Sequence, residues 1–87
     1  RTMTNYFLGM YRAVVQRMRQ RIQDLQDELS GTPPPDAQRR AQIQSEIAAL
    51  EAEIATILPK IEQLEQYEAR LPQIEDSLRS AASAVIP

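Results

Sequence analysis

The sequence predicts an all-α protein: an antiparallel αα-hairpin coiled coil with a short third helical segment, which oligomerises. Three observations predict this fold. Two segments of the 87-residue chain carry apolar residues at alternating spacings of three and four, a proline-rich stretch separates them, and Gln, Glu, Ala, Leu, Ile and Arg dominate the composition. Apolar residues at that spacing form one stripe on a helix, and such a composition is typical of coiled coils.

The first helix is predicted to cover residues 1–30. Its apolar residues recur over three heptads without a break and form the first seam: Leu8, Tyr11, Val15, Met18, Ile22, Leu25 and Leu29. Positions spaced in this way face a partner helix in a coiled coil. Phe7, Met10 and Val14 widen the stripe at the N-terminal end, so we expect this end to contact more than one neighbour.

Residues 31–36 are predicted to form a proline-rich turn. Gly31 follows the first seam, and glycine can adopt the positive φ that often ends a helix. Pro33, Pro34 and Pro35 lack the backbone N–H that a helix needs, and Asp36 is a favourable N-cap for a new helix. The same prolines fit a ligand of the PxxP type, but a tight turn between two helices explains them better.

A second helix is predicted over residues 37–71. Its seam has the same spacing as the first: Ile43, Ile47, Leu50, Ile54, Ile57, Ile61 and Leu64. Because the connection is short, the two helices are expected to be antiparallel neighbours. Pro59 lies inside this seam without changing its phase. A kink is expected there, because proline removes a backbone hydrogen bond and crowds the preceding turn.

The apolar stripe changes sides after Leu64. One row of the seam becomes glutamate, and apolar residues continue on the other side of the helix, so this part is expected to face something other than the first helix. With the widened N-terminal end it forms the predicted partner face: Phe7, Met10, Val14, Tyr67, Leu71, Ile74 and Leu78. Pro72 is predicted to begin the third segment, so that residues 72–87 comprise a short helix and a frayed tail.

Charge is unevenly distributed along the chain, although the net charge is only −2. Residues 1–21 contain five arginines and no acidic residue, whereas residues 41–87 contain eight acidic residues and three basic ones. Two antiparallel helices would place the basic stretch beside acidic stretches, so the charges are expected to neutralise each other within a hairpin or oligomer. A nucleic-acid partner is not expected, because binding requires a basic face without nearby acids.

The inventory of side chains argues against an enzyme. The chain has no His and no Cys, which removes the imidazole base, the thiolate nucleophile and the common zinc ligands. The best carboxylate pair, Glu62 and Glu65, fits a solvated helix face. We therefore predict no catalytic residue, no metal, no cofactor and no small-molecule ligand. No apolar run is long enough to span a bilayer; a weaker alternative is that the basic stretch 7–21 lies on a membrane surface.

Self-association is also predicted. A two-helix hairpin buries one stripe per helix, and the gain from two seven-residue seams scarcely exceeds the entropy lost when the chain orders. The partner face would then stay exposed. A stable state is therefore expected to contain two or more hairpins or a partner chain.

Four segments resemble a known family. They are Asn5-Tyr6-Phe7, the Gln-rich end of the first helix at residues 20–29, the Thr-Pro stretch at residues 32–36, and residues 48–57 with Leu64 and Gln66-Tyr67. Together they resemble the coiled-coil region of the central-channel FG nucleoporins, the family that includes nucleoporin fifty-eight/forty-five of vertebrates and nucleoporin forty-nine of fungi, or a sister in the same trimer. The resemblance covers roughly residues 5–70.

The resemblance implies a structural role in the nuclear pore complex of the nuclear envelope. Such proteins form a heterotrimer with other coiled-coil nucleoporins, dock to a scaffold nucleoporin, and anchor Phe-Gly repeats that carry nucleocytoplasmic transport of protein and mRNA. This chain would be the anchoring part. The alternative is a generic helical-hairpin oligomerisation module of another assembly, for instance in secretion or in a phage, and the two seams fit it equally well.

Overall fold

The computed structural model describes residues 3–85 and contains two α-helices, α1 (Met3–Leu29) and α2 (Ala37–Val85). The prediction of an all-α protein is confirmed, since the described part of the chain has no strand. The molecule is a rod, with extents of 78 × 18 × 14 Å. Its length is that of α2 alone, because 49 residues at 1.5 Å each span about 74 Å.

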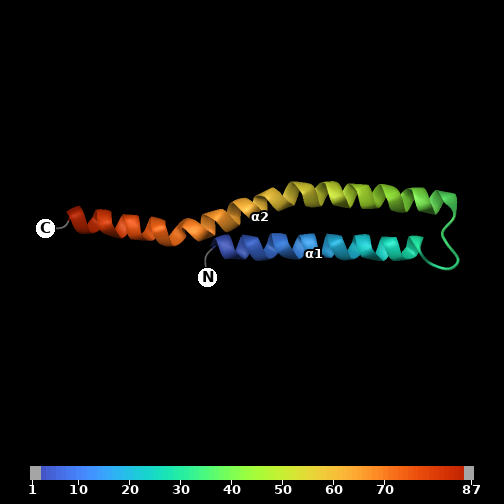
Figure 1. Ribbon diagram of the computed structural model, residues 1–87, viewed down its shortest axis with the longest axis horizontal. Coiled ribbons are helices and arrows are strands. Elements are labelled where there is room, and N and C mark those ends of the chain that lie inside the picture. Colours follow the sequence, from blue (N-terminus) through green and yellow to red (C-terminus); the bar gives the residue numbers. More distant parts are fainter. Residues whose placement is uncertain (1–2, 86–87) are drawn as a thin grey trace.

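α1 and the first part of α2 lie side by side and run in opposite directions (Figure 1). Between them lies an apolar core that both helices supply. Its buried residues are Leu8, Val15, Ile54 and Ile61, and the partly buried residues packed on them are Tyr11, Met18, Ile22, Ile57 and Leu64. Every residue of this core belongs to one of the two seams, so the apolar stripe of each helix is what joins it to the other.

α1 ends for a different reason from the one expected at Gly31. In residues 3–85 no glycine has a positive φ, so the predicted left-handed cap is wrong. Instead, the Ser30 amide donates to the Gln26 carbonyl at 3.1 Å and the Gly31 amide donates to the Glu28 carbonyl at 3.2 Å. A Cβ on Gly31 would lie 3.2 Å from that same carbonyl oxygen. Glycine is therefore favoured here because the backbone passes close to the last helical turn.

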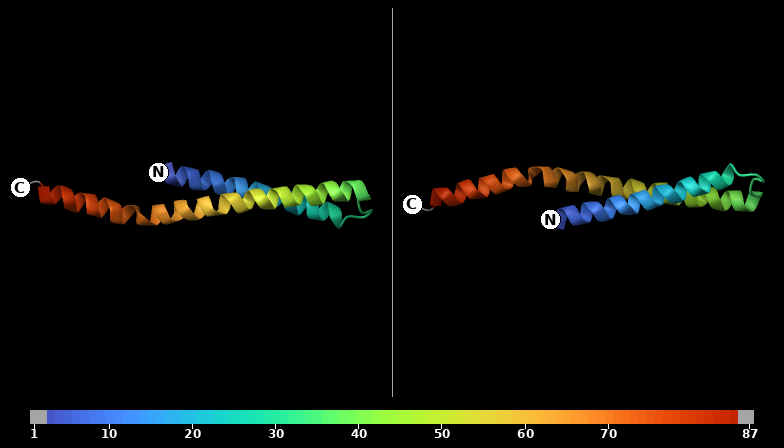
Figure 2. Two further views of the ribbon diagram at one scale, coloured as in Figure 1. Left: turned by 90° about the horizontal axis from the view of Figure 1, so that it is seen from above. Right: turned by 90° about the horizontal axis from the view of Figure 1, so that it is seen from below.

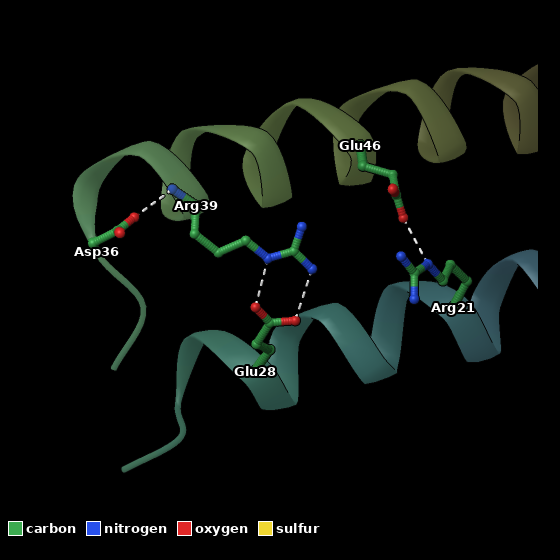
Figure 3. Close-up of polar contacts among 5 residues, drawn as sticks. All are labelled: Arg21, Glu28, Asp36, Arg39 and Glu46. Atoms are coloured by element: carbon green, nitrogen blue, oxygen red, sulfur yellow. Dashed lines mark hydrogen bonds and ion pairs between the residues drawn. The ribbon is translucent and has the colours of Figure 1, made fainter. Parts of the chain in front are cut away.

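α2 begins at the predicted position, and Asp36 caps it. The Asp36 carboxylate accepts a hydrogen bond of 2.8 Å from the Arg39 amide, while the Asp36 carbonyl accepts the Arg40 amide at 2.9 Å (Figure 3). The first amides of a helix have no partner within the helix, and an Asp at the N-cap supplies one. The cap explains why helical structure resumes directly after three prolines.

The predicted boundary at residue 71 is wrong, because α2 continues through Pro59 and Pro72 to Val85. There is accordingly no separate third helix in the described residues, and residues 80–85 are helical instead of frayed; residues 86–87 lie outside the described part. A proline removes only its own N–H, and a helix absorbs the steric clash by bending. Figure 2 shows α2 bowed in the yellow-to-orange part that carries the two prolines.

The last part of α2 has no helix beside it. α1 has 27 residues and α2 has 49, and the C-terminal end of α2 extends well beyond the N-terminal end of α1 (Figure 1). At 1.5 Å per residue the difference in helix length is about 33 Å. We call residues 66–85 the overhang, because Leu64 packs on the shared core and Glu65 pairs with Arg12 of α1. It includes the residues that were predicted to form a separate third segment, because α2 does not end before Pro72.

Candidate interaction surfaces

The first candidate surface is the interface between the two helices. All fourteen predicted seam residues are buried or partly buried, and six are fully buried: Leu8, Val15, Leu25, Ile43, Ile54 and Ile61. Leu25 and Ile43 are the most deeply buried side chains, with 1% and 0% of their surface exposed. Both lie near the turn, where the two helices are held together by the connection as well as by packing.

Each seam consists of two rows, in which successive residues are seven positions apart, and the more deeply buried row is not the same along the whole interface. In α1 the buried residues change from the row that contains Leu8 to the row that contains Leu25, and in α2 from the row of Ile43 to the row of Ile54. A seven-residue repeat drifts by about 20° per heptad around a straight α-helix. The deepest contact therefore moves sideways from one row to the other. The two helices accordingly cross when seen from above and below (Figure 2).

Two ion pairs bridge the helices near the turn (Figure 3). The Arg39 guanidinium donates two hydrogen bonds to the Glu28 carboxylate, at 2.6 and 2.9 Å, and the Arg21 guanidinium donates to Glu46 at 2.6 Å. In both pairs the partners are equally far from the point between residues 33 and 34. The two pairs therefore share one alignment of the helices, centred on the proline-rich turn.

These contacts favour the charged forms of the partners. The hydrogen bond from Arg39 lowers the pKa of Glu28, and the hydrogen bond to Glu28 raises the pKa of Arg39. The hydrogen bond to Glu46, with the attraction of its charge, likewise raises the pKa of Arg21. About half of each side chain faces solvent, where water and salt screen the attraction. We therefore assign these pairs a role in aligning the helices more than in stabilising them.

A third ion pair joins the basic stretch of α1 to α2 farther from the turn. The Arg12 guanidinium donates to the Glu65 carboxylate at 2.7 Å. With Arg21 and Glu46, this places two arginines of the basic stretch against acids of α2. The uneven charge along the chain thus becomes complementary charge across the helix pair. No ion pair in the described residues involves Arg17 or Arg19.

The second candidate surface is exposed and apolar, and it lies at the N-terminal end of α1. Tyr6, Phe7 and Met10 are 63%, 37% and 39% exposed, and the rings of Tyr6 and Phe7 meet edge to face with centroids 5.6 Å apart. Val14 is partly buried. Phe7 also borders an open groove with Tyr11, Lys60, Gln63 and Leu64, so the exposed patch is continuous with the interface between the helices.

The third candidate surface follows the overhang. Tyr67, Ile74 and Leu78 are 49%, 41% and 67% exposed, and Leu71 is partly buried. Val85, 81% exposed, extends the same stripe; it lies seven residues after Leu78, and that spacing is the signal that sequence reasoning overlooked. The seven predicted partner-face residues thus occupy two places, one on α1 and one on the overhang. Five of the seven are exposed, and Val14 and Leu71 are partly buried.

The chemistry available on these surfaces is packing and ion pairing. Among residues 3–85 no group of acidic side chains is arranged to hold a metal ion, and no buried side-chain polar atom lacks a hydrogen-bond partner. Glu62 and Glu65 are both exposed. Neither described helix contains a stretch long and apolar enough to cross a membrane. The exposed apolar side chains of the second and third surfaces are suited to packing against other helices.

No protein-family model, curated protein or solved structure matches this chain.

Proposed function

We propose that this chain is a structural assembly segment: an antiparallel αα-hairpin coiled coil that oligomerises and joins other chains through exposed apolar helix faces. The observation that carries the proposal is the overhang, which has no helix beside it (Figure 1) and in which Tyr67, Ile74 and Leu78 are exposed. A row of large apolar side chains left in water at heptad spacing is stabilised when another helix covers it. The N-terminal patch around Phe7 and Met10 supports the same role.

The larger assembly that we propose is the nuclear pore complex. The resemblance of residues 5–70 to the coiled-coil region of central-channel FG nucleoporins supports this, and a two-helix rod with open apolar faces is compatible with such a role. In this proposal the chain pairs with two other coiled-coil nucleoporins, docks to a scaffold nucleoporin, and anchors Phe-Gly repeats for nucleocytoplasmic transport. The alternative, a helical-hairpin oligomerisation module of another assembly, uses the same surfaces.

A paired substitution tests the assembly role. Ile54→Asp places a carboxylate in the core between the helices, where Ile54 is 8% exposed; an unpaired buried charge costs several kcal/mol, on the order of the whole stability of a small domain. Glu51→Ala, at an exposed position of the same helix, should change stability by no more than about 0.5 kcal/mol. We expect Ile54→Asp to abolish both self-association and partner binding, and Glu51→Ala to preserve them.

The assay is a pull-down of the coiled-coil channel nucleoporins and the scaffold nucleoporin by each variant, with thermal melts in parallel. Equal behaviour of the two variants would contradict the assembly role. The nuclear pore assignment is tested separately, by locating a fluorescent fusion of the full-length protein. A continuous signal at the nuclear rim supports it, and a signal confined to another compartment would favour the alternative module.

A further inference from the structure

The overhang carries a stripe with its own phase. Counted as heptad positions, Leu71, Leu78 and Val85 form one row, and Tyr67, Ile74 and Ala81 form the other. The first row continues the row of Leu64 in the core between the helices. At 100° per residue, residues 61 and 67 lie on opposite sides of residue 64 and equally far from it around the helix. The row of Tyr67 therefore lies on one side of the row of Leu64, and Ile61 lies on the other. The stripe therefore turns away from the side that α1 covers.

The stripe also has defined ends. Upstream, the row of Tyr67 and Ile74 continues with Lys60 and Glu53, both exposed and charged, so an apolar contact in this phase cannot extend toward the turn. The apolar positions from Tyr67 to Val85 span about 27 Å at 1.5 Å per residue. A helix of the same length and phase is the simplest partner for such a stripe, and a second copy of this chain supplies one.

Charges beside the stripe select the orientation of that second copy. Arg70 and Glu75 flank the two rows on opposite sides, five residues apart, and both are exposed. In a parallel pair of helices, the residue directly before Leu71 on one copy faces the residue directly after Ile74 on the other. Arg70 of each copy therefore meets Glu75 of the other. In an antiparallel pair, like positions face each other, and Glu75 then meets a glutamate of the partner. The parallel arrangement gives two attractive contacts in place of repulsion.

We propose that the overhangs of two copies of this chain pair in parallel, with Tyr67, Leu71, Ile74, Leu78, Ala81 and Val85 in the interface and Arg70 paired with Glu75 of the other copy. The upstream helix pairs diverge from this stem, because Lys60 and Glu53 replace apolar residues there. This inference rests on the assembly role proposed above and names the partner, the segment and the orientation. The stem uses a face of α2 that α1 leaves open, so both helix pairs persist in the dimer.

Sedimentation equilibrium of the 87-residue chain tests the interface. We expect a mass of two chains at tens of micromolar. Ile74→Asp should weaken the dimer at least tenfold without loss of helical content, because Ile74 is absent from the core between the helices. Ala69→Asp, at an exposed position of the same helix outside both rows, is the matched control and should leave the dimer intact. A monomeric parent chain, or equal weakening by both variants, overturns the proposal.

Cysteine crosslinking tests the orientation, since the chain has no cysteine of its own. In a parallel stem Tyr67 faces Tyr67 of the other copy, so Tyr67→Cys should form a disulfide-linked dimer on mild oxidation. In an antiparallel stem position 67 faces position 78 or 85. A mixture of Tyr67→Cys with Leu78→Cys or Val85→Cys that yields mainly the mixed disulfide overturns the parallel arrangement.

Charge exchange provides an independent check on the ion pair. Arg70→Glu alone and Glu75→Arg alone should each weaken self-association, because each opposes like charges. Mixed together, the two variants should form a heterodimer at least as readily as the unchanged chain. Failure of the mixture to restore pairing overturns the assigned contact. If the chain is monomeric but still captures the channel nucleoporins in the Ile54-dependent manner above, the stem is refuted while the assembly role stands.

Discussion

Shortening Ile43 to alanine probes the most deeply buried position of the helix pair. Ile43 is 0% exposed, so Ile43→Ala removes three carbon atoms from a site that water does not reach. At about 0.8 kcal/mol per buried methylene, the lost transfer free energy is about 2.4 kcal/mol. Any cavity adds to this, but in a pair of only two helices α1 can move toward α2 and fill most of the space. We expect the free energy of unfolding to fall by about 2–3 kcal/mol.

For a chain of this size, a loss of 2–3 kcal/mol corresponds to a fall in Tm of roughly 10–20 °C. The assay is thermal unfolding followed by circular dichroism, at a concentration where sedimentation shows a monomer. Ile74→Ala is the matched control, since it makes the same change in the same helix at a position 41% exposed. It should shift Tm by only a few degrees. Equal shifts for the two variants would refute the assignment of the core to the seam residues.

Two smaller predictions concern the polar contacts near the turn. Asp36→Ala should destabilise the chain by about 1 kcal/mol, because the Arg39 amide loses its acceptor, and chemical denaturation should show Asp36→Asn losing less; equal losses would contradict the capping role. Because the hydrogen bond from Arg39 lowers the pKa of Glu28, this pair stabilises the folded chain above the ordinary glutamate pKa and ceases to do so as pH falls through the lowered value. Melts between neutral and acidic pH should therefore show a weaker pH dependence in Glu28→Gln than in the unchanged chain, and identical profiles would speak against the pair.

Heptad spacing made the helical class and the residues between the helices predictable. Apolar residues spaced three or four positions apart form a single stripe on a helix, and that stripe is shielded from water only when another helix packs on it. All fourteen seam residues could therefore be named from the sequence, and all are at least partly buried. The turn was equally local in origin, because three consecutive prolines cannot donate backbone hydrogen bonds. The alignment of the helices near the turn, about the point between residues 33 and 34, follows from the position of that turn.

The extent of α2 was not predictable in the same way. Pro72 reads locally as a helix start, yet α2 passes through it as it passes through Pro59, and the helix bends in this part (Figure 2). The proline rule concerns one hydrogen bond and one steric contact, and the surrounding turns decide whether a helix tolerates both. The consequence is an exposed apolar stripe that begins about eight turns into α2, where a separate third segment was predicted.

The sequence by itself determined which residues face inward, where the chain turns, and that charges of opposite sign would be available across the helix pair. Only the tertiary structure decided which row of each seam is deepest, which arginine meets which glutamate, and how far α2 projects beyond α1. These outcomes depend on the crossing of two helices whose turns do not match a seven-residue repeat, and on the bend that two prolines introduce. Such properties belong to the pair of helices and to their geometry in space, and a pattern along one chain does not contain them.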